Sequence, residues 1–228
     1  MKNYSLIKIL IFILLNEYSG VLFSQDITFN SFLGVFRIDT LPFNSFKINS
    51  DNEFINHKKK YKIPKSDIIK YLIKDTSELG YKYFAEAMDN NNKKEMYYET
   101  RFYAYCRFSI ISNYYLVIYN KENSYNSDFY LNIYDKSGFK IVSYQLTGDG
   151  MDTYFFASEV DVDLSIKKVT YTFIEDNKTK IDIENYSFDL GTKGYKLIKH
   201  KTIYTSHFYG EYEKHKLDDD PFKIVEKK

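Results

Sequence analysis

The sequence has almost no cysteine. Cys106 is the only one in 228 residues, so no disulfide can form within one chain, and no cysteine near the N-terminus can carry a lipid. Cys106 lies between Tyr105 and Arg107 in a strand-like segment, where alternation places the Arg107 side chain on the opposite face. We therefore interpret Cys106 as a buried or half-buried free thiol that is not activated.

The sequence also lacks an excess of positive or of negative residues. Lysine and arginine total 32 and aspartate and glutamate 31, a net charge of +1, and only three of the basic residues are arginine. Residues 1–24 contain Lys2, Lys8 and Glu17, which sum to +1, so residues 25–228 carry a formal charge of +1 − 1 = 0. This composition argues against nucleic acid and anionic membranes as partners, because both are bound by basic, often arginine-rich surfaces.

Tryptophan is absent and there are four alanines, yet aromatic residues make up 19% of the chain. A coding bias toward A and T produces such a composition, and β-sheets accommodate tyrosine and phenylalanine well. A dedicated aromatic ligand-binding face is the alternative interpretation.

The chain lacks a long hydrophobic run. The apolar stretch from Ile9 to Leu15 follows Lys2 and Lys8, and it is shorter than the roughly 20 residues that span a bilayer. The pattern predicts a signal peptide over residues 1–24, cleaved between Ser24 and Gln25, with a transmembrane anchor as the alternative. We expect a secreted or periplasmic protein with no stable membrane anchor after cleavage.

Residues 25–228 are predicted to form a single β-rich domain. It consists of a helix-containing N-terminal layer over residues 25–92, an antiparallel sheet over residues 94–205 and a charged tail over residues 206–228.

Two apolar patterns in the N-terminal layer predict short helices. The first pattern is Phe29, Phe32, Leu33 and Phe36, with spacings of three and four. The second follows Pro64 in residues 66–73, with Ser66 as the expected N-cap. In the polar stretch over residues 49–62, the run Lys58-Lys59-Lys60 is expected to be a solvated loop or a strand edge, with an anion site as the alternative.

From residue 94 onward, alternation predicts about eight strands. These are residues 96–111, 114–119, 128–134, 139–146, 153–162, 166–174, 180–190 and 195–205. The best-defined unit is the hairpin from Phe129 to Leu146, whose turn Asp135-Lys136-Ser137-Gly138 has the residues of a type I turn closed by glycine. In this hairpin Phe129, Leu131 and Ile133 are predicted to face the core.

The predicted fold is therefore mainly β: an antiparallel meander of about eight strands with two short N-terminal helices packed on it. An open sheet, a sandwich and a propeller-like arrangement all remain compatible with this pattern.

The sequence contains candidate ligand and metal sites but no catalytic motif. No serine lies in a Gly-x-Ser-x-Gly elbow, and no cofactor is expected. Tyr130, Tyr134 and Tyr144 are the candidate ligand-binding residues. A metal site could form from His207, Glu211 and His215 if residues 206–216 were helical, although Gly210 argues against a helix.

Function is predicted mainly by elimination. We expect an exported protein of bacterial type that is a non-enzymatic binding module for a protein or glycan partner. The alternative is an extracytoplasmic hydrolase that uses Glu159, Asp161 and Asp163, which at i, i+2 and i+4 would lie on one face of an extended strand.

Overall fold

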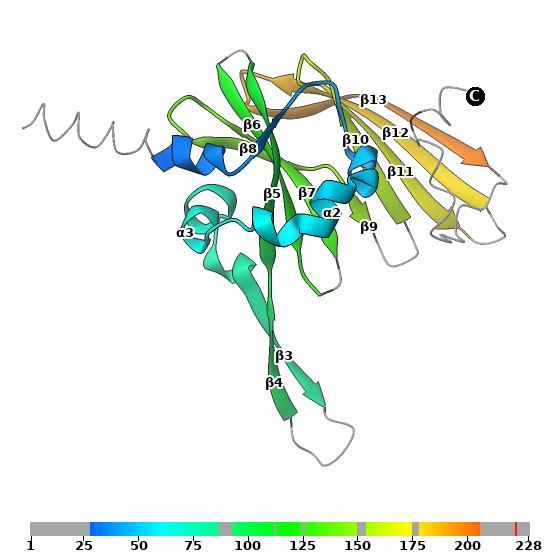
Figure 1. Cartoon of the computed structure of the whole chain (residues 1–228). Helices are drawn as coiled ribbons and strands as arrows, with labels where there is room; N and C mark the ends of the chain where they lie inside the picture. The colour runs from blue at the N-terminus through cyan, green and yellow to red at the C-terminus, as the bar shows by residue number, and fades with distance from the viewer. Residues whose placement is uncertain are drawn as a thin grey trace, which may run out of the picture.

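The computed structural model describes residues 28–86, 93–111, 113–124, 126–149, 154–174 and 178–205, together with Phe222. Two β-sheets form the body of this part of the chain, and short helices lie against them (Figure 1). The prediction of a mainly β fold with antiparallel strands and a few short helices is confirmed. No helix in these ranges has the length and apolar composition needed to cross a membrane.

The first sheet has the strand order β1-β5-β6-β7-β8. Strands β5 to β8 pair antiparallel in sequence, and β1 pairs parallel to β5 at the edge. The strands are β1 (Arg37–Asp39), β5 (Arg101–Ile111), β6 (Tyr114–Glu122), β7 (Ser127–Tyr134) and β8 (Lys140–Gln145).

The second sheet has the order β13-β12-β11-β10-β2, and β9 also pairs with β10. All its pairs are antiparallel. The strands are β2 (Phe43–Asn44), β9 (Gly148–Asp149), β10 (Tyr154–Val160), β11 (Ile166–Ile174), β12 (Lys178–Asp189) and β13 (Gly194–Thr205).

The expected series of strands is thus divided into two meanders, β5 to β8 and β10 to β13. The chain leaves the first sheet just after β8, where the Leu146 backbone N–H donates to the Phe129 carbonyl at 2.7 Å. The Thr147 hydroxyl then accepts from the Phe129 backbone N–H at 2.9 Å. β1 and β2, from the N-terminal part, each add an edge strand to one of the two sheets. The strands of the two meanders thus belong to two sheets and not to one open sheet.

A separate two-stranded sheet projects from the body as an arm (Figure 1). It consists of β3 (Gly80–Glu86) and β4 (Lys93–Glu99). The single strand expected over residues 96–111 is therefore wrong: β4 ends at Glu99 and β5 begins at Arg101. Between them the Thr100 backbone N–H donates to the Leu79 carbonyl at 2.9 Å, which holds the base of the arm to the preceding helical turn.

Apart from Phe222, the helical residues that the structure describes lie in the N-terminal third of this part of the chain. They are a helix over residues 28–34, η1 (Ser45–Ser50), α2 (Asn52–His57), η2 (Lys58–Tyr61), α3 (Lys65–Asp67), the π-helical η3 (Ile68–Leu72) and η4 (Thr76–Leu79).

Two expectations for this region are corrected. The segment over residues 49–62 is largely helical, because the Asp51 carboxylate caps α2 by accepting from the Phe54 N–H at 3.0 Å and Phe54 is buried. Ser66 is not an N-cap: the helix begins at Lys65, and Pro64 is at the cap position.

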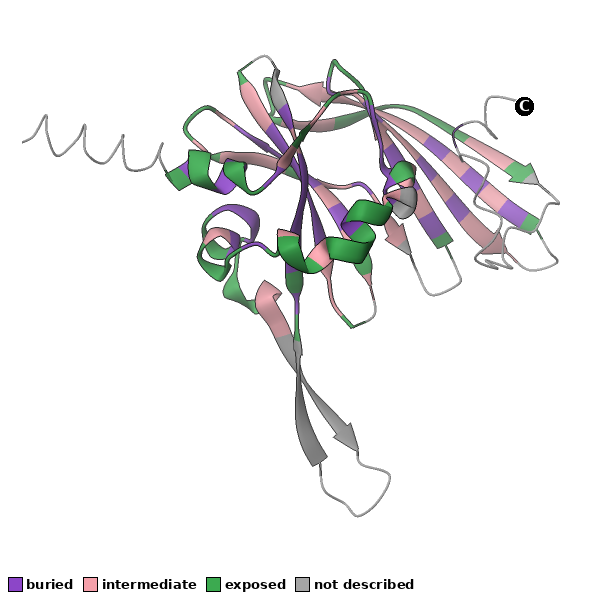
Figure 2. Cartoon of the chain, in the orientation of Figure 1, coloured by how far each residue is buried: buried purple, intermediate pink, exposed green. Residues whose placement is uncertain are grey.

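Both faces of the first sheet are buried (Figure 2). One face packs against the second sheet, and the predicted core residues Phe129, Leu131 and Ile133 lie there with Val160 and Ile166. The opposite face is covered by the helix over residues 28–34 and by η3. The buried residues of that second cluster include all four members of the first predicted helix: Phe29, Phe32, Leu33 and Phe36.

A third cluster lies on the far side of the second sheet. Phe155, Tyr171 and Ile181 form its centre, and Phe222 is buried against them. At least this residue of the predicted charged tail therefore packs on the domain.

Candidate functional site

An open pocket of about 450 Å³ lies between two hairpin turns of the first sheet. Asn113 and Tyr114 line it from the β5–β6 connection, and Asp135, Lys136 and Ser137 line it from the β7–β8 turn. Pockets that hold small ligands have volumes of roughly 300 to 1,000 Å³. The pocket is therefore large enough for a small ligand.

The β7–β8 turn has the geometry that its sequence predicts. Asp135 Oδ1 accepts from the Ser137 backbone N–H at 2.9 Å, from the Ser137 hydroxyl at 2.6 Å and from the Phe139 backbone N–H at 3.0 Å. Gly138 closes the turn with φ of 81°, and its N–H donates to the Asp135 carbonyl at 3.0 Å. The side chains of Asp135 and Ser137 are thus held in place before any ligand arrives.

Asp135 is ionised at neutral pH. Burial alone would raise the pKa of its carboxyl, but the hydrogen bonds from Ser137 and Phe139 and the positive charge of Lys193 lower the pKa below its ordinary value. Together with Lys136, Asp135 leaves the pocket lining with a formal charge of zero. The lining therefore offers hydrogen-bond donors and acceptors without a net charge.

A row of aromatic side chains runs from the pocket into the space between the two sheets. Ring centroids in this aromatic row are 5.9 Å apart for Tyr114 and Phe188, 5.4 Å for Phe188 and Tyr195, 5.2 Å for Tyr195 and Tyr144, and 5.7 Å for Tyr144 and Tyr186. The Tyr195 hydroxyl is buried and has no hydrogen-bond partner among the residues that the structure describes. Burial raises the pKa of Tyr195, so this hydroxyl keeps its proton.

The three candidate ligand-binding tyrosines do not come together. Tyr144 belongs to the aromatic row, on the face of the first sheet that packs against the second sheet. Tyr134 and Tyr130 lie on the opposite face. Tyr134 is fully buried there and donates to the Tyr71 carbonyl at 2.8 Å, whereas Tyr130 is half-buried.

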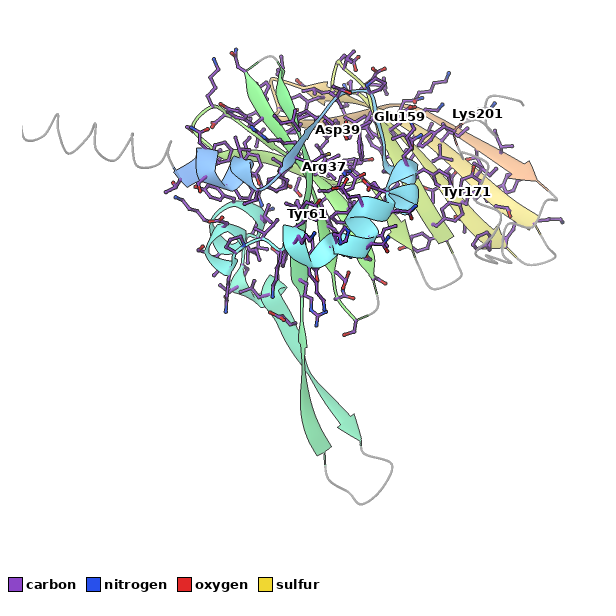
Figure 3. The ribbon with its side chains drawn as sticks, in the orientation of Figure 1. Arg37, Asp39, Tyr61, Glu159, Tyr171 and Lys201 are labelled. Atoms are coloured by element: carbon purple, nitrogen blue, oxygen red, sulfur yellow. The ribbon has the colours of Figure 1, made fainter. Side chains whose placement is uncertain are left out.

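The carboxylates considered for a hydrolase do not form a row on one strand. β10 ends at Val160, so Glu159 lies in the strand while Asp161 and Asp163 lie in the turn to β11; Figure 3 labels Glu159. The expected strand over residues 153–162 is too long at this end. Asp163 accepts from the Ser165 N–H at 2.8 Å, and the hydrogen bonds from Ser165 lower the pKa of its carboxyl. A general acid needs the opposite shift.

The candidate metal ligands His207, Glu211 and His215 lie outside the described residues. Within the described ranges, no group of three or more His, Cys, Asp or Glu side chains is placed to hold a metal ion. Cys106 is fully buried, as expected, and burial raises the pKa of its thiol well above the ordinary value.

Sequence reasoning missed a polar cluster at the edge of the first sheet, where Figure 3 labels Arg37. The Arg37 guanidinium pairs with Asp51 and lies 4.3 Å from the centroid of the Tyr105 ring. The Tyr105 hydroxyl donates to Asp51 Oδ2 at 3.0 Å. The three residues join β1, the cap of α2 and β5, so we interpret the cluster as structural. Their distance from one another in the sequence left no local signal.

The pocket was also missed, although its Asp135-to-Gly138 turn was predicted. Asn113 and Tyr114 lie more than twenty residues before that turn. No local pattern predicts that the two connections meet, so only the pairing of β6 with β7 brings them together.

Fold and site together define a mainly β protein of two antiparallel-rich sheets with an open pocket at the turns of one sheet. Comparisons of the chain with protein-family models, curated proteins and solved structures gave no match.

Proposed function

We propose that this protein is an exported, non-enzymatic binding module that holds a glycan in the pocket between the β5–β6 and β7–β8 turns. The observation that carries the proposal is the pocket lining: an amide, a phenol, a carboxylate, an ammonium group and a hydroxyl, with no net charge. Such groups can exchange hydrogen bonds with a hydroxyl-rich, uncharged ligand, and the Tyr114 ring offers an apolar surface for a sugar.

A glycan fits this pocket better than a protein surface does. Stable protein interfaces bury about 800 Å² on each partner, whereas this lining comes from five residues in two turns. A protein partner would need contacts well beyond the pocket.

Export is supported by the N-terminal sequence. Lys2 and Lys8 precede a short apolar run, and Ser24 provides a small residue at the expected cleavage position. Expression of the complete chain should yield a shorter protein outside the cytoplasm, which N-terminal sequencing would show to begin at Gln25. Full-length protein retained in the cytosol would contradict the export proposal.

Glycan binding can be tested on a glycan array, followed by calorimetry with each glycan that binds. Asn113→Gly removes the amide but keeps the backbone conformation, because Asn113 has φ of 77° and glycine adopts this region freely. Lys136→Ala removes an exposed pocket side chain. Each variant should weaken binding about three- to tenfold, the value of one hydrogen bond.

The matched control is Lys59→Ala, an exposed lysine on η2 outside the pocket lining. It should bind like the wild type. If no glycan binds, or if both Asn113→Gly and Lys136→Ala retain full affinity, the pocket is not a glycan site. Retention of a protein from the cell envelope that Asn113→Gly abolishes would instead support the protein alternative.

A further inference from the structure

Glu78 lies on the helix-covered side of the first sheet, close to lysines from three segments, of which Lys121 pairs with it directly. Lys121 Nζ of β6 lies 3.0 Å from Glu78 Oε2. The Lys74 backbone N–H donates to Glu78 Oε1 at 3.0 Å, and the Lys140 ammonium group of β8 donates to the Leu72 carbonyl at the end of η3. Lys74, Lys121 and Lys140 together form the lysine cluster.

The positive charges of the lysine cluster are only partly offset. Glu78 is one nearby carboxylate, and Asp128 is another, since it lies opposite Lys121 across β6 and β7. Three ammonium groups and two carboxylates give a formal charge of 3 − 2 = +1. Burial lowers the pKa of Lys140; Glu78 counters this effect, and the charges of Lys74 and Lys121 lower the pKa further.

The strand between Lys121 and Lys140 adds a neutral donor. Tyr130 of β7 is half-buried, and its ring stacks on Tyr119 with centroids 5.5 Å apart and an interplanar angle of 17°. Burial, followed by the charges of Asp128 and Glu78, raises the pKa of Tyr130 to about 12, so the phenol keeps its proton at neutral pH.

We propose that the lysine cluster, with Tyr130, is a second binding site, and that it takes a singly charged oxyanion group: the sulfate ester or the carboxylate of an acidic saccharide. One negative charge would neutralise the excess of the three lysines, and ammonium groups and a phenol all donate to oxyanions. The choice of a saccharide as the source of the anion rests on the proposed glycan function, but the anion site itself does not.

The pocket and Lys121 lie on opposite faces of the first sheet. The pocket connects to the aromatic row on the face that packs against the second sheet. Lys121 lies on the other face, with its ammonium group 5.8 Å from the ring centroid of Phe102, a member of the helix-covered cluster. Lys121→Met therefore changes the lysine cluster away from the pocket, whereas Lys140 comes three residues after Ser137 of the pocket lining.

Calorimetry with glucose 6-sulfate and glucuronate is the test, with glucose as the uncharged probe and inorganic sulfate as the free ion. The anionic sugars should bind and glucose should bind more weakly. Lys121→Met and Lys140→Met should each weaken the anionic sugars about tenfold, since each removes a charged hydrogen bond while methionine keeps an apolar stem. Added salt should weaken binding as well.

Glu78→Gln gives a result that a merely structural cluster would not produce. Removal of a carboxylate that repels the ligand should strengthen binding of the anionic sugars about fivefold. This variant also tests the proposal if Lys140→Met fails to fold.

Lys58→Met is the matched control, because Lys58 of η2 pairs with Glu122 of β6. The side chains of Lys58 and Glu122 are 22% and 28% exposed, similar to the 24% and 36% of Lys121 and Glu78. Lys58→Met should leave the affinity for the anionic sugars unchanged.

Equal binding of glucose and glucose 6-sulfate, or full affinity in Lys121→Met, would overturn the anion site. Loss of binding in Asn113→Gly with no change in Lys121→Met would assign the anionic sugar to the pocket and overturn the proposal. Binding of an acidic peptide, or of inorganic sulfate alone, would overturn the saccharide source.

Discussion

Gly138 occupies a position that no other residue should fill without loss of stability. Its φ is 81°, and a Cβ added there would lie 2.6 Å from Cγ and 2.8 Å from Cδ2 of Phe29. The Phe29 ring cannot easily retreat, because it is 1% exposed. Other rings surround it at centroid distances of 5.3 to 5.9 Å: Phe32, Tyr71, Tyr115 and Tyr134.

Gly138→Ala should therefore destabilise the protein through two effects. An alanine in the left-handed region costs about 1–2 kcal/mol, and overpacking against a buried ring costs about 1–3 kcal/mol. Together they predict a loss of about 2–5 kcal/mol, a large share of the roughly 5–15 kcal/mol that stabilises a typical domain. Gly138→Asn separates the two effects. Asparagine tolerates positive φ, so mainly the contact with Phe29 should remain.

Urea unfolding followed by far-UV circular dichroism measures these losses. The control is Gly34→Ala in the helix over residues 28–34, where an added Cβ has nothing within 4 Å. It should be neutral or stabilising by up to about 1 kcal/mol, because alanine favours a helix more than glycine does. A Gly138→Ala protein within about 0.5 kcal/mol of the wild type would refute the packing of the β7–β8 turn on the N-terminal helix.

Three further predictions concern pH, a buried hydroxyl and metal. Burial alone would raise the pKa of Asp51, but hydrogen bonds, first that of Arg37, lower it. The ionised Asp51 therefore stabilises the folded protein above about pH 4, and this stabilisation is lost as pH falls through the folded-state pKa. Asp51→Asn should lower the free energy of unfolding more at pH 7 than in acid. Tyr134→Phe leaves the buried carbonyl of Tyr71 without its donor and should cost about 1–3 kcal/mol. Zinc should leave the melting temperature of the wild type unchanged, since Gly210 argues against the helix that would bring His207, Glu211 and His215 together.

Each of these has a control or a contradicting result. Asp51→Asn with the same loss at both pH values would mean that the ion pair does not produce the pH dependence. Tyr204 is 67% exposed, so Tyr204→Phe should leave the free energy of unfolding unchanged. An equal loss of stability in Tyr134→Phe and Tyr204→Phe would refute the role of the buried hydrogen bond. A zinc-induced rise in melting temperature that His207→Ala abolishes would revive the metal site.

Local chemistry explains why part of the fold could be predicted. The Asp135-to-Gly138 turn is built from hydrogen bonds between neighbours, and Phe129, Leu131 and Ile133 alternate on a strand with a period of two. The first helix follows from the spacing of four apolar residues, all of which are buried. In each case the information lies within a few residues.

Other expectations failed where a cap or turn hydrogen bond, or the burial of one side chain, changed the structure that the pattern predicts. Residues 49–62 look like a polar loop, but Asp51 caps α2 and burial of Phe54 stabilises it as a helix. Residues 153–162 look like one strand, but β10 ends at Val160 because the next residues form a turn: the Leu164 N–H donates to the Asp161 carbonyl at 3.0 Å.

The sequence by itself determined the mainly β class, the hairpin from Phe129 to Leu146 and the helix over residues 28–34, because propensity, alternation and turn residues act over short distances. Only the tertiary structure decided that the strands form two sheets, that Tyr134 and Tyr144 lie on opposite faces, and that Glu78 meets Lys121. Those arrangements depend on which distant segments pair and pack, and that choice is set by the burial of both faces of the first sheet at once.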